Sequence, residues 1–132
     1  MLTTSDIFEW LKGDSSFIGV FALNKLPTIL NISNEVKLVV NTDSDNLPGT
    51  HWIAVWRKPD SGHAEVFDSF AQHPPSEVQL WCNKYCHAWT YNTQCIQSVT
   101  STLCGHYCCL FLVCRHKFNS MHDCVEYLSQ IV

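Results

Sequence analysis

The stretch QSVTSTLCGHYCCLFL, residues 97–112, decides the fold of this chain. Its first half is a loop of small hydroxyl residues, and its second half is an apolar run that predicts a helix from about Cys104 to His116. Because apolar residues cover nearly all sides of this helix, we expect it to be buried in the centre of the domain. The stretch therefore predicts a buried central helix whose first residue is a cysteine.

Cys104 lies at the start of the predicted helix, a position that favours the thiolate form of a cysteine. The positive end of the helix dipole and a nearby imidazolium lower a cysteine pKa below its free value of about 8.5. The amide of Gln97, on the same loop, can donate to a substrate oxyanion beside the backbone N–H of Cys104. The residues alone leave a second interpretation open, in which Cys104 is a buried structural cysteine and Gln97 an ordinary loop residue.

Length and composition indicate a single globular domain over residues 1–132. The chain is 46% hydrophobic and contains five Trp, seven Phe and four Tyr, which is typical of a packed core rather than of disorder. A net charge of −4 and a pI near 5.9 argue against a broad nucleic-acid-binding face.

The eight cysteines indicate reduced thiols rather than a disulfide framework. The segment 1–10 lacks the basic start and apolar core of a signal peptide, and cysteines such as Cys108 and Cys109 lie inside apolar runs. The longest apolar run, 107–114, is far shorter than the roughly 20 residues of a membrane span. We therefore expect a protein of the cytoplasm or nucleus that is not secreted.

The first half of the chain predicts a helix and several short strands. Ser5 or Asp6 can cap a first helix that ends near Lys12. Residues 17–23 form either a strand or a turn, and 35–40 form a strand. The polar loop 41–49 contains acidic residues without calcium-binding spacing, so we expect a solvated loop.

A hairpin is predicted from strand 50–57, turn 58–62 and strand 63–70, with antiparallel pairing. This pairing brings His51 and Asp68 to the same edge of the sheet. There a carboxylate can hold an imidazole in one tautomer. The residues alone also allow a surface histidine and a strand-end aspartate that make no contact.

The second half predicts a helix over 76–86, a strand over 88–96 and an amphipathic last helix over 120–132. Together the elements predict an α+β fold with a central, mostly antiparallel sheet packed by the buried helix. A zinc module is a rival interpretation, because two His/Cys pairs have permitted internal spacing: Cys82, Cys86, His116 and His122. The interval between the pairs is more than double the roughly 12 residues of the usual finger, so we expect no metal site.

Three motifs of the chain resemble the adenovirus maturation protease family, adenain. They are GTHW at 49–52, FDSF at 67–70, and NTQCIQ at 92–97 leading to CGHYCCLFL at 104–112. They are similar to relatives in Polinton/Maverick elements and adenovirus-like viruses as well. The order His, acid, Gln, Cys is shared more distantly with SUMO- and ubiquitin-like-specific proteases. The resemblance covers nearly the whole chain and implies a papain-like or adenain-like cysteine protease fold.

The resemblance also implies a role for each residue of the motifs. His51 matches the general base and Cys104 the nucleophile. Asp68 matches the orienting acid, where adenain has Glu, and Gln97 matches the oxyanion donor. Trp52 is a family feature that is either a core aromatic or part of the substrate cleft.

The activity implied by the resemblance is that of a thiol endopeptidase. It would cleave after small residues of the glycine type in polypeptides such as capsid or core precursors, as a viral or transposon-encoded maturation protease. The implied location is the host cytoplasm or nucleus, or the virion. Alternatives with the same triad are an isopeptidase for ubiquitin or SUMO and an acyltransferase. A binder of ubiquitin-like proteins is an alternative use of the same fold.

Two departures and one further match bear on activation. The chain is shorter than adenain after the central helix, so the role of that family's C-terminal part is not carried over. It is also acidic, whereas adenain is stimulated by DNA, so DNA activation is not carried over. Cys86 stands at the same distance before Gln97 and Cys104 as the adenain cysteine that captures a cofactor peptide. The resemblance therefore implies Cys86 as an attachment point for a peptide activator, with an ordinary helix-end thiol as the alternative. No other cofactor is expected.

Overall fold

The computed structural model describes residues 2–29, 31, 34–42, 51–98 and 101–131. The predicted loop 41–49 and the strand start at Thr50 lie largely outside these residues. The elements in chain order are α1 Thr4–Leu11, β1 Phe17–Ala22, the 3₁₀ helix η1 Leu23–Lys25, β2 Val36–Asn41, β3 Trp52–Arg57, β4 His63–Phe67, α2 Ser76–Tyr85, β5 Ala88–Tyr91, α3 Cys104–Cys114, the 3₁₀ helix η2 Arg115–Lys117 and α4 Met121–Ile131.

The strands form one sheet in the order β1-β2-β3-β4-β5. The two inner pairings, β2 with β3 and β3 with β4, are antiparallel, and the second of them is the predicted hairpin. The two outer pairings, β1 with β2 and β4 with β5, are parallel because η1 and α2 provide crossover connections. The predicted α+β fold is confirmed, but the sheet is mixed, with two antiparallel and two parallel pairings, rather than mostly antiparallel.

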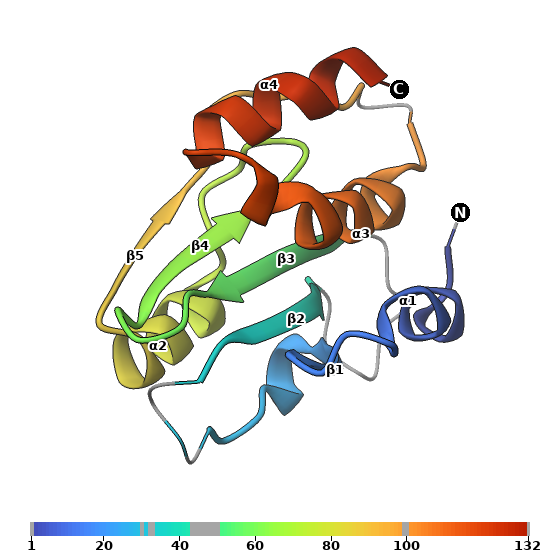
Figure 1. Cartoon of the computed structure of the whole chain (residues 1–132). Helices are drawn as coiled ribbons and strands as arrows, with labels where there is room; N and C mark the ends of the chain where they lie inside the picture. Colours follow the sequence, from blue (N-terminus) through green and yellow to red (C-terminus); the bar gives the residue numbers. More distant parts are fainter. Residues whose placement is uncertain (1, 30, 32–33, 43–50, 99–100, 132) are drawn as a thin grey trace.

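Helices cover both faces of this sheet (Figure 1). On β3, Trp52, Ala54 and Trp56 face the core shared with α1, α3 and α4. Ile53 and Val55 point to the opposite face and pack in the core shared with α2. This period-2 alternation of a strand buried on both faces makes β3 the centre of the molecule.

The helices agree with the predicted ranges except at their ends. The first helix is capped by Thr3, not by Ser5 or Asp6, and Asp6 is instead the reciprocal partner in a capping box with Thr3. The stretch 17–23, left open between strand and turn, forms the edge strand β1. The strand predicted over 88–96 ends at Tyr91, and the following residues run as an extended segment toward α3.

The central helix α3 is buried, as its composition predicted, and is held at its far end by an ion pair. Its α-helical part ends at Cys114, and η2 continues the turn. The Arg115 guanidinium donates to both carboxylate oxygens of Glu65 on β4, at 2.6 and 2.8 Å. Such bidentate geometry fixes the position of α3 on the sheet. No helix in the described part of the chain is long and apolar enough to cross a membrane.

The packing of α3 on β4 predicts a large loss of stability in Phe111→Ala. Phe111 is fully buried and its ring stacks on Phe67 of β4, with centroids 4.6 Å apart. Truncation leaves a cavity, so we expect the free energy of unfolding in urea to fall by about 3–5 kcal/mol. Val113→Ala is the matched control, because Val113 lies on the same helix with 41% of its surface exposed. Its loss should stay within about 0.5 kcal/mol, and equal losses in the two variants would contradict this packing.

Candidate active site

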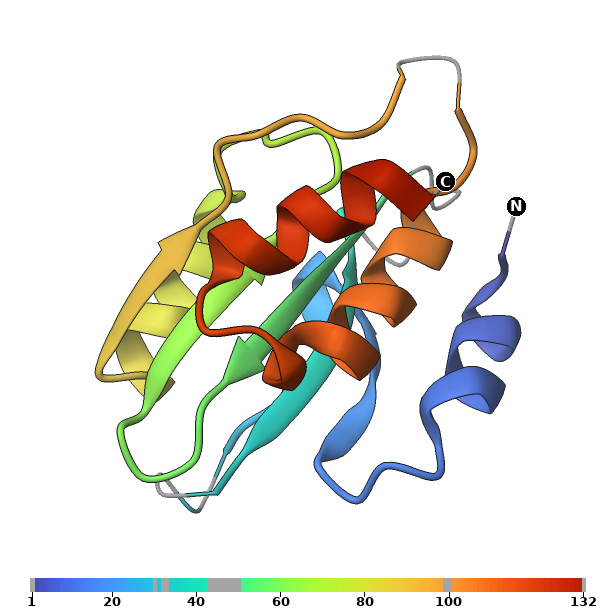
Figure 2. The same ribbon diagram turned by 45° about the horizontal axis from the view of Figure 1, so that its top comes forward.

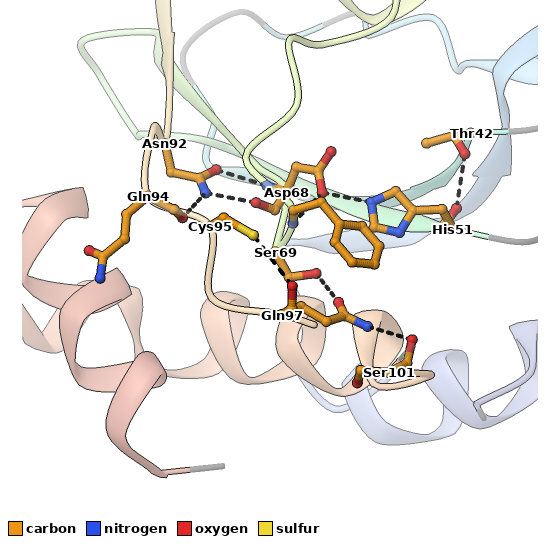
Figure 3. A network of polar contacts seen from close by, with 10 residues as sticks. Thr42, His51, Asp68, Ser69, Asn92, Gln94, Cys95, Gln97 and Ser101 are labelled. Atoms are coloured by element: carbon orange, nitrogen blue, oxygen red, sulfur yellow. Dashed lines mark hydrogen bonds and ion pairs between the residues drawn. The ribbon is translucent and has the colours of Figure 1, made fainter. Parts of the chain in front are cut away.

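The sheet brings His51 and Asp68 together. His51 directly precedes β3 and Asp68 directly follows β4, and the antiparallel register pairs Ala54 with Phe67 between them. Nε2 of His51 lies 2.6 Å from Oδ1 of Asp68, and both side chains are mostly buried (Figure 3). The contact that the hairpin pattern predicted is therefore present.

Asn92 holds the backbone of Asp68 in place. Its side-chain oxygen accepts from the Asp68 N–H at 2.9 Å, and its side-chain nitrogen donates to the Asp68 C=O at 2.7 Å. The Phe70 N–H adds a 2.8 Å hydrogen bond to Oδ1 of Asp68. Asn92 lies inside a quoted motif, but its role was missed from sequence. The available signal was a polar residue directly after the short strand β5.

The ring of His51 is poised to be cationic. Asp68 occupies Nε2, while the second ring nitrogen, Nδ1, is buried. Nδ1 is thus the ring atom left for the Cys104 sulfur. Burial disfavours the charged ring, but hydrogen bonds and charge interactions with Asp68 and Cys104 outweigh it and raise the pKa of His51 to about 9.

The same pairing favours the thiolate of Cys104. Burial disfavours the anion, but a hydrogen bond with His51, the backbone N–H of Trp52, the charge of His51 and the backbone N–H of Gly105 together lower the pKa of Cys104. Cys104 is also the first residue of α3, where the N–H groups of the first turn lack partners within the helix. The lowered pKa of Cys104 and the raised pKa of His51 therefore both favour a thiolate–imidazolium pair.

Gln97 lies on the segment that leads from β5 to Cys104 at the start of α3. Its Nε2 donates to the backbone C=O of Ser101 at 3.1 Å, and its Oε1 accepts a hydrogen bond from the Ser69 hydroxyl. The Ser69 C=O in turn accepts from the N–H groups of Ile96 and Gln97, at 2.9 and 3.2 Å. These bonds join the segment after β4 to the segment after β5 (Figures 2 and 3). Ser69, like Asn92, was not singled out from sequence.

Trp52 packs in the core, and Cys86 lies at the end of the sheet opposite to Asp68. The Trp52 side chain is 5% exposed and packs in the core under α3, where a Cβ at Gly105 would lie 3.4 Å from the indole. Cys86 is the C-cap of α2, just before the start of β5, whereas Asp68 lies after the end of the parallel strand β4. Cys86 thus lies at the opposite end of the sheet. Among the described residues, no group of three or more His, Cys, Asp or Glu side chains could hold a metal ion.

Comparison with known proteins confirms the resemblance to adenovirus proteases. A protease of Bovine adenovirus C serotype 10 is 30% identical over 102 residues, which cover 65% of this chain and 51% of that protein. A protease of Snake adenovirus serotype 1 is 28% identical over 120 residues, covering 80% of this chain and 59% of that protein. The chain thus spans between half and three fifths of the length of these relatives. No protein-family model matches it.

A solved structure shares the fold. The crystal structure of a protease of ASFV superposes on 95% of this chain and 61% of its own, with a TM-score of 0.70 and 19% sequence identity. At this identity the likeness supports the arrangement of helices and sheet.

The raised pKa of His51 and the lowered pKa of Cys104 predict the pH dependence of Cys104 alkylation. Because only the thiolate reacts with iodoacetamide, the rate at Cys104 should rise at a pH below the ordinary thiol pKa of 9.0. His51→Ala removes the cation, so the rise should move upward toward that value. Alkylation is followed at each cysteine by mass spectrometry of peptides.

Cys95, an exposed thiol in the same sample, serves as the internal control because its alkylation should not respond to His51→Ala. An unchanged Cys104 profile in His51→Ala would show that the ring does not stabilise this thiolate.

Proposed function

We propose that this chain is a cysteine endopeptidase in which Cys104 is the nucleophile. The observation that carries the proposal is the buried His51–Asp68 hydrogen bond at 2.6 Å, together with the raised pKa of His51 and the lowered pKa of Cys104. A raised histidine pKa and a lowered cysteine pKa in one pair are what a thiol nucleophile requires. The similarity to adenovirus proteases supports the same activity.

In the first step the Cys104 thiolate attacks the carbonyl carbon of a peptide bond. The carbonyl oxygen becomes an oxyanion, which accepts hydrogen bonds from the backbone N–H of Cys104 and from the second N–H of the Gln97 amide. The first N–H of that amide is already held by Ser101. Each such donor contributes about 3 kcal/mol to the transition state.

In the second step the tetrahedral intermediate collapses and the C–N bond breaks. The His51 imidazolium gives its proton to the leaving amine, which leaves a thioester on Cys104. Water then attacks the thioester while His51 accepts a proton from it, and the acid product and the Cys104 thiolate are released. Asp68 keeps Nε2 occupied throughout and stabilises the ring whenever it is an imidazolium.

We propose polypeptides with a small residue of the glycine type before the cleaved bond as substrates. Cys104 and Gln97 are each 4% exposed, so the sulfur is reached most easily by a backbone without a side chain. The viral origin of the relatives supports a precursor-maturation role in a virion or in the cytoplasm or nucleus of its host.

A cleavage assay on peptides containing Gly-Gly or Gly-X tests the proposal. Wild type should cleave after glycine, and Cys104→Ser should lose activity because the serine hydroxyl stays protonated beside His51. Cleavage that survives this substitution would refute Cys104 as the nucleophile.

The alternatives give different outcomes in parallel assays. Labelling by a thiol-reactive ubiquitin-like probe without peptide cleavage would indicate an isopeptidase or a binder of ubiquitin-like proteins. Acetyl transfer from acetyl-CoA would indicate an acyltransferase.

We also propose Cys86 as the attachment point of a peptide activator. Cys86 is half-buried and lines a cavity of about 300 Å³ with Lys84 and His87. A hydrogen bond with Cys82 and, despite burial, the charge of Arg57 lower the pKa of Cys86, which favours the attacking thiolate. The thiolate would attack a disulfide-linked peptide dimer and displace one peptide thiolate.

Cys86→Ser tests this attachment. It should abolish both the mass increase by one peptide and the activation by a cysteine-containing peptide dimer, while basal cleavage persists. Cys114→Ser, at another half-buried thiol, is the matched control. Unchanged activation in Cys86→Ser would discard the proposal.

A further inference from the structure

Ser69 is a fully buried polar residue that the catalytic steps above do not use. It follows Asp68 directly and makes three hydrogen bonds to the segment from β5 to α3. Its hydroxyl donates to Oε1 of Gln97, and its C=O accepts from the backbone N–H groups of Ile96 and Gln97. Only the first of these bonds depends on the side chain of Ser69.

We propose that the Ser69 hydroxyl is a positioning group that sets the orientation of the Gln97 carboxamide. This inference rests on the proposed function, because it assigns Ser69 a part in stabilising the oxyanion through Gln97. Ser69 does not itself touch the reacting atoms.

The orientation of the Gln97 carboxamide follows from which neighbouring groups can donate a hydrogen bond and which can only accept one. The C=O of Ser101 only accepts hydrogen bonds, so it must face the NH₂ end of the Gln97 side chain, and it lies 3.1 Å from Nε2. Oε1 then faces Ser69, whose hydroxyl can donate. A flipped amide would set Oε1 against the Ser101 oxygen, two acceptors without a proton between them. The two contacts together leave one N–H of Nε2 for the oxyanion.

The position of Ser69 in the chain links the two halves of the site. Asp68 fixes the ring of His51, and the next residue fixes the amide of Gln97, so a single dipeptide after β4 orients both. Preorganised donors stabilise developing charge because they need no reorganisation during the reaction. Loss of the hydroxyl should therefore lower kcat more than it raises KM.

Ser69→Ala removes the hydroxyl and keeps the backbone C=O contacts. We expect kcat for a glycine-containing peptide to fall by about tenfold or more, short of the roughly 100-fold or larger loss on removing an oxyanion donor in Gln97→Ala. KM and the pH profile of Cys104 alkylation should stay unchanged, because the pair of His51 and Cys104 is intact. In the Gln97→Ala background, Ser69→Ala should cost nothing further in kcat.

Ser16→Ala is the matched control for the loss of a serine hydroxyl. Ser16 donates to Asp14 at 2.6 Å in the turn before β1, in a contact separate from the site. This variant should keep kcat unchanged. Additive losses in the Ser69→Ala, Gln97→Ala double variant, or a shifted alkylation profile in Ser69→Ala, would show a merely structural role and overturn the proposal.

A readout that does not need turnover separates this proposal from the proposed function. In ¹⁵N-labelled protein the two side-chain N–H protons of Gln97 should give separate, slowly exchanging signals, identified by their absence in Gln97→Ala. In Ser69→Ala we expect these signals to exchange faster with water. Unchanged signals would overturn the positioning role, whereas absence of cleavage by wild type with the signals as expected would overturn only the protease assignment.

Discussion

The hydrogen bond between Nε2 of His51 and Oδ1 of Asp68 is the contact on which the site depends. It selects the ring nitrogen that faces the carboxylate, and so leaves Nδ1 for the Cys104 sulfur. It also supplies the negative charge that lets a mostly buried ring remain protonated near neutral pH. Without this carboxylate, burial would neutralise the ring, and the thiolate would lose the cation that stabilises it.

The fold brings three chain segments together at the site. The antiparallel pairing of β3 and β4 fixes His51 and Asp68 at one edge of the sheet. The helix α3 delivers Cys104 to the same edge, because its far end is tied to β4 through Arg115 and Glu65 and its middle stacks on Phe67 through Phe111. The segment after β5 brings Gln97, held by Ser69. The strands and α3 thus position His51, Asp68 and Cys104, and hydrogen bonds hold Gln97, as preorganisation requires.

Sequence predicted the parts of this arrangement that follow from local patterns. A hairpin puts the residues before its first strand and after its second at one edge, so the contact of His51 with Asp68 could be anticipated. The apolar run after Cys104 likewise predicted a buried helix. The catalytic roles given to these residues came from the resemblance and stay proposals.

Sequence could not reveal contacts that depend on tertiary packing. Asn92 and Ser69 are common loop residues, and their roles arise only because the segments after β4 and β5 lie side by side. The parallel pairing of β5 depends on α2 crossing the sheet, which a period-2 pattern does not encode. The cap of α1 was misplaced because Thr3, Ser5 and Asp6 all favour N-caps, and packing of Ile7 and Leu11 selects the register.

The most direct test is the charge state of the His51 ring, followed by ¹³C and ¹⁵N chemical shifts of labelled histidine between pH 5 and pH 11 on the ordinary histidine scale. Assignment uses the signals missing in His51→Ala. The structure predicts that His51 stays cationic through neutral pH and titrates at about 9. A ring that titrates near the ordinary value of 6.5 would contradict the thiolate–imidazolium pair at the centre of this account.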